Sequence, residues 1–180
     1  FNEPKLPPPE RTERFSAARI APSPSLLSRI DPPVVRVIPG REMADFAEES
    51  IQAFFGSPFK VLPQSDRMGI RLEGVSIRRT AAGELISTGV AAGTIQVPPN
   101  GQPIVLMADS QPTGGYPRIA QAAAVDLPTL AQLRPGESLV FVLIDLEEAE
   151  RLLDERARAL AQLRAGVCAY WRRRGRVADD

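Results

Sequence analysis

The chain contains no histidine and a single cysteine, Cys168, among its 180 residues. Without histidine, Ser-His-Asp and Cys-His catalysis within the chain are excluded, and the commonest metal ligand is missing. We therefore expect no resident metal. Because a lone cysteine cannot form an intrachain disulfide, the sequence fits a reducing compartment, and we expect a cytoplasmic protein.

Long apolar runs and an excess of one charge are also absent. No apolar run approaches the roughly 20 residues that span a bilayer, so we expect no membrane insertion. Lys and Arg total 22, as do Asp and Glu, which leaves no global field to attract nucleic acid. The basic run Arg172–Arg176 compensates a helix C-terminus more simply than it binds nucleic acid. The hydrophobic content of 43% is ordinary for a globular protein with a core.

Proline, in contrast, is abundant, with 18 residues that divide the chain. Eight of them fall within residues 1–33, where they favour an extended or polyproline II backbone. We predict a proline-rich linker or arm over 1–33 and a β-rich domain, a barrel or a sandwich, over 34–145. An amphipathic helix with a basic tail is predicted over 146–180.

Short β-like runs dominate the middle of the chain, and Gly-containing turn signals separate them. Many short strands at this spacing are typical of a barrel or sandwich, so we predict a mainly β fold. The expected strands are Val34–Ile38, Phe59–Leu62, Gly69–Leu72, Gly74–Arg78, Leu85–Val90, Thr94–Val97, Ile104–Ala108, Ile119–Val125 and Ser138–Leu143.

Three segments have helical periodicity. The first is Met43–Phe55, which Gly56 ends, and the second is Leu127–Leu133, with Asp126 as a candidate N-cap. The third runs from Leu146 to about Arg174, either as one long helix or as two helices broken near Gly166, and it could lie on the barrel or dock on another chain. Its apolar stripe, which Arg156 interrupts, consists of Leu146, Ala149, Leu153, Leu160, Leu163, Val167 and Tyr170.

A first polar cluster spans Ser65–Gly74. Arg67 and Arg71 alternate with apolar residues there, so on a strand they would share one face. Two guanidinium groups on one face can hold a carboxylate or phosphate bidentately. The alternative is a pair of surface salt bridges to Asp66 and Glu73, which are common and weak.

A second polar cluster surrounds the hairpin signal Asn100-Gly101. Gln96 and Gln102 would stand near each other across this hairpin. Carboxamides both donate and accept hydrogen bonds, which suits an amide, lactam or ureido group. Alternatively, the two side chains satisfy backbone groups of the turn.

A third polar cluster, Asp109–Pro117, combines acidic, amide, hydroxyl and phenol groups with two glycines. Its polar side chains are Asp109, Gln111, Thr113 and Tyr116. Successive backbone N–H groups at Gly114-Gly115 could form an anion-binding nest. No Gly-Lys-Ser/Thr follows, so this is not a Walker A loop. The alternative is an ordinary polar loop between strands.

Four separated runs carry a resemblance to a known family: PQSDRMGIRLEG (63–74), GTIQVPPNGQPIVLMAD (93–109), TGGYPRI (113–119) and DLPTLAQLRPGE (126–137). In order and spacing they resemble the C-terminal half of the C subunit of 5-oxoprolinase. This family is also called allophanate hydrolase subunit 2 or biotin-dependent carboxyltransferase-like protein. The resemblance covers roughly Val34–Ala149 and implies a cyclophilin-like β-barrel.

The resemblance implies a hydrolase that works in a complex. In the family, the C subunit joins the B subunit; together with the A subunit, they open 5-oxoproline to glutamate at the expense of ATP. The complex, rather than this chain alone, would bind the ATP. Family members are about twice as long, so we expect this chain to be a fragment or a split-gene product, with the N-terminal half and A-like and B-like subunits as partners.

Two alternatives follow from the same resemblance. One is the carboxyltransferase domain of a urea carboxylase, which would take its carboxyl group from carboxybiotin. The other is a regulatory, non-catalytic partner of a kinase-inhibitor protein, for which the C-terminal helix would suit docking.

The residues that match the family motifs are assigned roles by their chemistry. Arg67 and the loop Thr113, Gly114, Gly115 and Tyr116 would hold a carboxylate or a phosphorylated group. Asp109 or Tyr116 would handle a proton in the absence of histidine. The lactam or ureido group would be hydrogen-bonded by Gln96, Gln102 and Gln111.

The chain departs from the usual family pattern at three places. Ser87-Thr88-Gly89-Val90 stands where the family usually has Ser-Glu-Gly-Val, which removes an acidic side chain. Ser110 and Pro112 replace an arginine and a threonine, so a cation is lost beside the expected site. Gly40-Arg41-Glu42 replaces a more usual Gly-Pro-Gln.

Overall fold

The computed structural model of the chain describes residues 32–81, 83 and 85–173, with side chains through Trp171. The described residues fall into two compact units. One contains the barrel and continues through Arg156, and the other contains the rest of the last helix from Ala157. The predicted arm over 1–33, apart from its last two prolines, and the basic tail from residue 174 lie outside the described residues.

Seven strands form a closed barrel in the order β1-β8-β5-β6-β3-β2-β9, which confirms the prediction of a mainly β barrel. Parallel pairing of β9 with β1 closes it, and the remaining pairs are antiparallel. The barrel strands are β1 (Val34–Pro39), β2 (Phe59–Val61), β3 (Gly69–Glu73), β5 (Thr94–Gln96), β6 (Ile104–Leu106), β8 (Arg118–Ala122) and β9 (Ser138–Leu143).

The core is built from side chains that alternate along these strands. Val35 and Val37 of β1 are fully buried while their neighbours are partly exposed, as expected for a strand with one inward face. Helix α2 (Glu48–Gly56) adds Phe54, whose ring lies 4.6 Å from that of Phe141, between centroids. Phe59 completes this aromatic cluster. Burial of each such side chain contributes about 1.5–3 kcal/mol.

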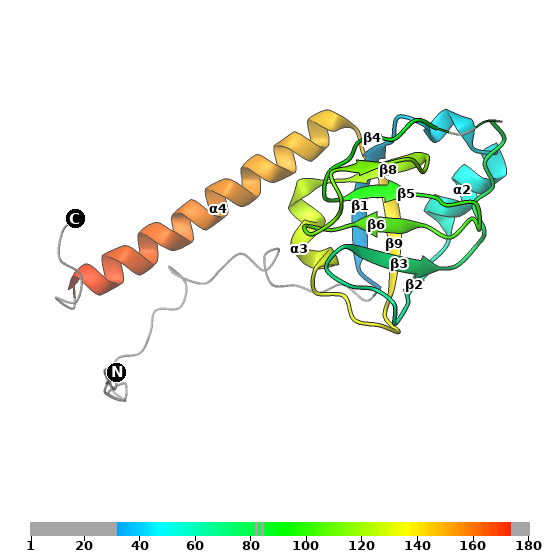
Figure 1. Cartoon of the computed structure of the whole chain (residues 1–180). Coiled ribbons are helices and arrows are strands. Elements are labelled where there is room, and N and C mark those ends of the chain that lie inside the picture. Colours follow the sequence, from blue (N-terminus) through cyan, green and yellow to red (C-terminus); the bar gives the residue numbers. More distant parts are fainter. Residues whose placement is uncertain (1–31, 82, 84, 174–180) are drawn as a thin grey trace. The chain divides into compact units, whose positions relative to one another are not determined.

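Helices α2 and α3 (Leu127–Leu130) lie at opposite ends of strands β3, β5 and β6 (Figure 1). The predicted helix Met43–Phe55 is wrong at its start. A 3₁₀ turn, η2 (Met43–Asp45), comes first, and Phe46 then bridges to Arg79 in extended geometry. Phe46 is buried at this bridge. Its apolar side chain therefore fits the spacing of a helix face although the residue is extended.

Asp126 does not cap α3 with its side chain, contrary to expectation. A 3₁₀ turn, η3 (Ala124–Asp126), precedes the helix. The buried carboxylate instead accepts hydrogen bonds from Arg36, with Nε–Oδ2 at 2.8 Å and Nη2–Oδ1 at 2.5 Å. This bidentate pair joins β1 to the segment before α3.

Two predicted strands are largely lost. Gly74–Arg78 forms no strand, because the Ile77 N–H donates to the Gly101 carbonyl and the Arg78 N–H to the Ser50 hydroxyl. Leu85–Val90 shrinks to β4 (Thr88–Gly89). This strand pairs with β7 (Thr113–Gly114), and the two form a separate ribbon.

The last helix, α4 (Leu146–Arg173), continues through Gly166 without a break. Arg156, which interrupts its apolar stripe, donates a hydrogen bond from Nη1 to the Val125 carbonyl at 2.5 Å. Within the described ranges, none of the helices has the length and apolarity needed to cross a membrane.

Candidate functional site

The barrel separates the predicted site residues onto its two ends. Strands β5 and β6 run antiparallel with Gln96 opposite Ile104, and Leu106 faces Gly69 on β3. We call the end marked by Gln96 and Ile104 the Gln96 end, and the end marked by Leu106 and Gly69 the Asp109 end. Their separation along the strands is roughly 10 Å, at about 3.3 Å per residue from Ile104 through Met107.

Arg67 and Asp109 form an ion pair at the Asp109 end, with Nε–Oδ2 at 3.1 Å. Their side chains are 91% and 46% exposed, so water screens this pair strongly. Arg67 precedes β3 and therefore does not share a strand face with Arg71. The predicted partner Asp66 instead accepts hydrogen bonds from the backbone N–H groups of Met68 and Gly69.

Gln102 holds a turn. Its Oε1 accepts from the Gly74 N–H at 2.9 Å, and its Nε2 donates to the Gly74 carbonyl at 3.3 Å. Gln96 is directed to the other side of the hairpin, where its Nε2 donates to the Tyr116 carbonyl at 3.2 Å. The structure therefore does not bring Gln96 and Gln102 together, and Gln102 has the backbone role that was the alternative.

Gln96 is the most deeply buried of the predicted site residues, at 5% exposure. Its Oε1 accepts no hydrogen bond from any residue that the structure describes, and it is not sealed from solvent. Gly114 lies against the same carboxamide. A Cβ atom at Gly114 would stand 2.5 Å from Gln96 Nε2. A side chain at this position would therefore displace the Gln96 amide.

The loop that follows Asp109 crosses from the Asp109 end to the Gln96 end through β7. Thr113 pairs with Gly89, and Gly114 with Thr88. Gln111 and Thr113 are exposed, as is Tyr116 at 48%. Neither Gly114 nor Gly115 has the left-handed backbone that an anion-binding nest uses, since the described glycines with positive φ are Gly83, Gly93, Gly101 and Gly136.

A largely buried ion pair between Arg118 and Glu42 adjoins Gln96, and neither partner is among the predicted site residues. Arg118, on strand β8, stands opposite Gln96 in the sheet register. The Arg118 guanidinium donates to Glu42 twice, with Nε–Oε2 at 2.7 Å and Nη2–Oε1 at 2.5 Å. Arg118 Nη1 also donates to the Gly89 carbonyl at 3.4 Å, which joins the ribbon to the barrel. The signal in the sequence was the departure at Gly40-Arg41-Glu42, which points to the acid but not to its partner.

The hydrogen bond from Arg118 is the main cause that lowers the pKa of Glu42 below its usual 4.5. A carboxyl group with a lowered folded-state pKa contributes stability above its unfolded pKa and loses it as the pH falls through the folded value. We predict that the free energy of unfolding falls more steeply below about pH 4.5 in the natural chain than in Glu42→Gln. Urea unfolding at several pH values measures this. Glu49→Gln, at an exposed position of α2, should keep the natural slope, and identical slopes for all three chains would refute the role of Glu42.

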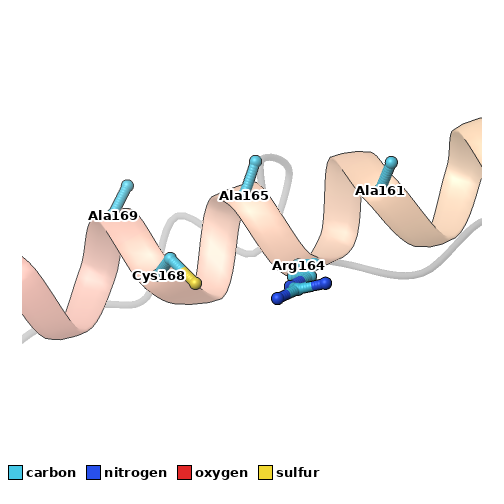
Figure 2. Close-up of a pocket in the computed structure, with 5 residues that line it drawn as sticks. All are labelled: Ala161, Arg164, Ala165, Cys168 and Ala169. Atoms are coloured by element: carbon cyan, nitrogen blue, oxygen red, sulfur yellow. The ribbon is translucent and has the colours of Figure 1, made fainter. Parts of the chain in front are cut away.

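The other largely buried ion pair with two guanidinium hydrogen bonds, Arg36 with Asp126, contains none of the predicted site residues. No group of three or more Cys, Asp or Glu side chains among the described residues is placed to hold a metal ion. An open hollow of about 600 Å³ lies along α4, where Ala161, Ala165 and Ala169 point to one side and Arg164 and Cys168 to another (Figure 2). None of these five residues is among the site residues predicted from the sequence.

Sequence comparison identifies the relatives of the chain. The profile of the family described as "Carboxyltransferase domain, subdomain A and B" matches residues 3–143. Two proteins named as the C subunit of 5-oxoprolinase are 46% identical over 129 residues in Escherichia coli K12 and 39% identical over 131 residues in Haemophilus influenzae. These alignments cover 72% and 73% of this chain but only 42% of each relative.

Solved structures support the same fold. The urea amidolyase of Kluyveromyces lactis superposes with a TM-score of 0.68 over 72% of this chain and 8% of that protein, at 23% identity, which shows likeness of fold alone. The protein TTHA0988 is 38% identical, with a TM-score of 0.52 over 61% of this chain and 21% of that one. By sequence alone, the urea amidolyase of Saccharomyces cerevisiae is 28% identical over 131 residues, 66% of this chain and 7% of that one.

Proposed function

Since the chain belongs to the carboxyltransferase-domain family, subdomains A and B, we propose that it is the C-terminal barrel of a protein like the C subunit of 5-oxoprolinase. It would act with an N-terminal half and with A-like and B-like subunits in the ATP-dependent ring opening of 5-oxoproline to glutamate. The relatives at 46% and 39% identity, both named as this C subunit, support the proposal.

The observation that carries the proposal is the buried carboxamide of Gln96 at the end of β5. One of its N–H groups is used on the Tyr116 carbonyl, which fixes the orientation of the amide. Its Oε1 remains able to accept a hydrogen bond, and the N–H of a lactam ring is a matching donor. A buried, oriented amide of this kind can distinguish a cyclic amide from a substrate that lacks the N–H.

The other proposed residues divide according to the barrel end on which they lie. Tyr116 follows the ribbon at the Gln96 end, so we assign it the proton-handling role in preference to Asp109. Gly114 lies against Gln96, and we assign its neighbours Thr113 and Gly115, with the exposed Gln111, to the same site. Arg67 and Asp109 lie at the Asp109 end, roughly 10 Å along the strands from the Gln96 end, so we assign them no contact with the lactam. Gln102 is likewise left out, because it holds the turn at Gly74.

ATP is assigned to the other subunits of the complex. The chain lacks a Gly-Lys-Ser/Thr motif, and Thr113-Gly114 is a strand and not a phosphate-binding nest. ATP would supply the free energy for opening a stable ring, whereas the residues of this chain would bind and orient the lactam.

Reconstitution tests the proposal. The chain is combined with its N-terminal half and the A-like and B-like subunits, and ATP hydrolysis is measured with and without 5-oxoproline. We expect turnover that requires both 5-oxoproline and this chain. An assembled complex with no such turnover would refute the proposal.

A second candidate function rests on the urea amidolyase relatives, which are 28% identical over 131–134 residues. In that case the domain would transfer a carboxyl group from carboxybiotin to urea. The same reconstitution would then show dependence on biotin and bicarbonate in place of 5-oxoproline.

A further inference from the structure

Helix α4 carries a row of exposed apolar side chains at a strict seven-residue spacing. Leu146, Leu153, Leu160 and Val167 are 59%, 44%, 46% and 39% exposed. The helix begins at Leu146, after the family profile ends at residue 143. This apolar row, which we call the heptad row, is therefore not part of the matched carboxyltransferase segment.

A seven-residue repeat is the pattern by which helices pair in a left-handed supercoil. Helix α4 has 28 residues, which corresponds to four heptads and about 42 Å. Away from this row, in the first part of the helix, Arg151 pairs with Glu148 and with Glu155 of the same helix. The heptad row is thus the face on which a second helix would pack.

The charges along α4 specify the partner. The first ten residues hold five acidic side chains and one arginine, whereas the remaining eighteen hold five arginines and no acid. A helix with this distribution is complementary to a reversed copy of itself and repels a copy in the same direction. We propose that α4 pairs antiparallel with α4 of a second copy of this chain.

The heptad positions set the register of this pair. The second core position of each heptad lies three residues after the heptad row, at Ala149, Arg156, Leu163 and Tyr170. In an antiparallel pair, a residue of the heptad row such as Leu153 faces a residue at the second core position, such as Leu163 of the partner subunit. This alignment places Glu150 beside Arg164 of the partner subunit, twice over because the interface is isologous. Neither Glu150 nor Arg164 forms an ion pair with any residue in the described part of its own chain. Arg156, the polar residue of the core positions, is directed to the Val125 carbonyl.

The oligomeric state of the full chain tests the pairing. Sedimentation velocity should show a dimer of twice the 19.6 kDa chain, and the double variant Leu153→Glu, Leu160→Glu should be monomeric. Ile86→Glu, at an exposed position of the barrel unit (88%), is the matched control and should remain dimeric. A monomeric natural chain, or a dimer that survives the double variant, would overturn the proposal. Circular dichroism checks that the variants retain α4.

Charge exchange tests the antiparallel register. Glu150→Arg and Arg164→Glu should each raise the dimer dissociation constant by at least about tenfold, because two ion pairs become two repulsions. The double exchange should restore it. If the double exchange is no better than either single variant, Glu150 does not face the partner's Arg164, so the register is wrong.

The single exposed cysteine reports the orientation directly. In the proposed register, Cys168 lies level with Glu148 of the partner subunit, so the two Cys168 positions stand roughly 30 Å apart along the helices, at about 1.5 Å per residue. A spin label on Cys168 should give a distance near or above this value by pulsed electron resonance. A distance well below it would indicate parallel helices and contradict the proposal. These experiments need no activity, so they stand apart from the proposed 5-oxoprolinase function.

Discussion

The Gly40→Ala chain is expected to lose at least about 3 kcal/mol of its free energy of unfolding. A Cβ atom at Gly40 would lie 2.3 Å from the Arg118 carbonyl oxygen and 2.7 Å from the Ala120 nitrogen. These are backbone atoms of β8, so no side-chain rotation relieves the clash. The Gly40 N–H also donates to the Ile119 carbonyl at 2.9 Å, and this bond would lengthen as the segments separate.

The closed barrel makes the effect large, because β8 is held on its other side by β5 and cannot move away freely. Gly56→Ala is the matched control. It lies at the end of α2, where a Cβ atom would have no other atom within 4 Å, and it should change the unfolding midpoint little. Urea unfolding of the natural chain and both variants measures the difference. Equal midpoints for Gly40→Ala and Gly56→Ala would show that the strand contact at Gly40 is not tight.

Gly114→Ala is expected to reduce kcat/KM for 5-oxoproline by at least about 100-fold in the reconstituted complex, equivalent to about 2.7 kcal/mol. The new methyl group would meet Gln96 Nε2 at 2.5 Å. Since that atom is the tip of a side chain, the amide would be displaced before the strands separate, and the free energy of unfolding should change far less than in Gly40→Ala. The measurement is steady-state ATP turnover at varied 5-oxoproline.

Gly89→Ala provides the control for this prediction. Gly89 pairs with Thr113 in the same ribbon, yet a Cβ atom there would meet nothing within 4 Å. Its activity should stay within about threefold of the natural chain, as expected for a substitution without a new contact. If both glycine variants lose activity equally, the ribbon itself, rather than the position of the Gln96 amide, controls turnover.

Much of the barrel could be predicted from the sequence because its strands carry clear apolar runs. The expected Ser138–Leu143 strand agrees residue for residue with β9. The ribbon strand Thr113–Gly114 was missed because it is only two residues long, contains glycine and pairs with a segment more than twenty residues away. Gly74–Arg78 was wrongly predicted as a strand. Its apolar Ile77 is buried, but it belongs to a loop whose backbone N–H groups donate to the Gly101 carbonyl and the Ser50 hydroxyl.

The site was harder to predict than the fold, because motifs adjacent in sequence separate onto opposite barrel ends. Gln96 and Asp109 share one motif run, but the hairpin between β5 and β6 sends them in opposite directions. The Glu42–Arg118 pair joins residues 76 positions apart, so no local pattern could reveal it. Only the sheet register shows that Arg118 adjoins Gln96.

The comparison of Gln96→Ala with Asp109→Ala in the reconstituted complex tests the central claim most directly. The claim is that the substrate binds at the Gln96 end of the barrel. It predicts that Gln96→Ala lowers 5-oxoproline-dependent ATP turnover, as kcat/KM, by at least about 100-fold, while Asp109→Ala stays within about threefold. The reverse result, a large loss for Asp109→Ala with Gln96→Ala nearly unchanged, would place the site at the Asp109 end and contradict the account.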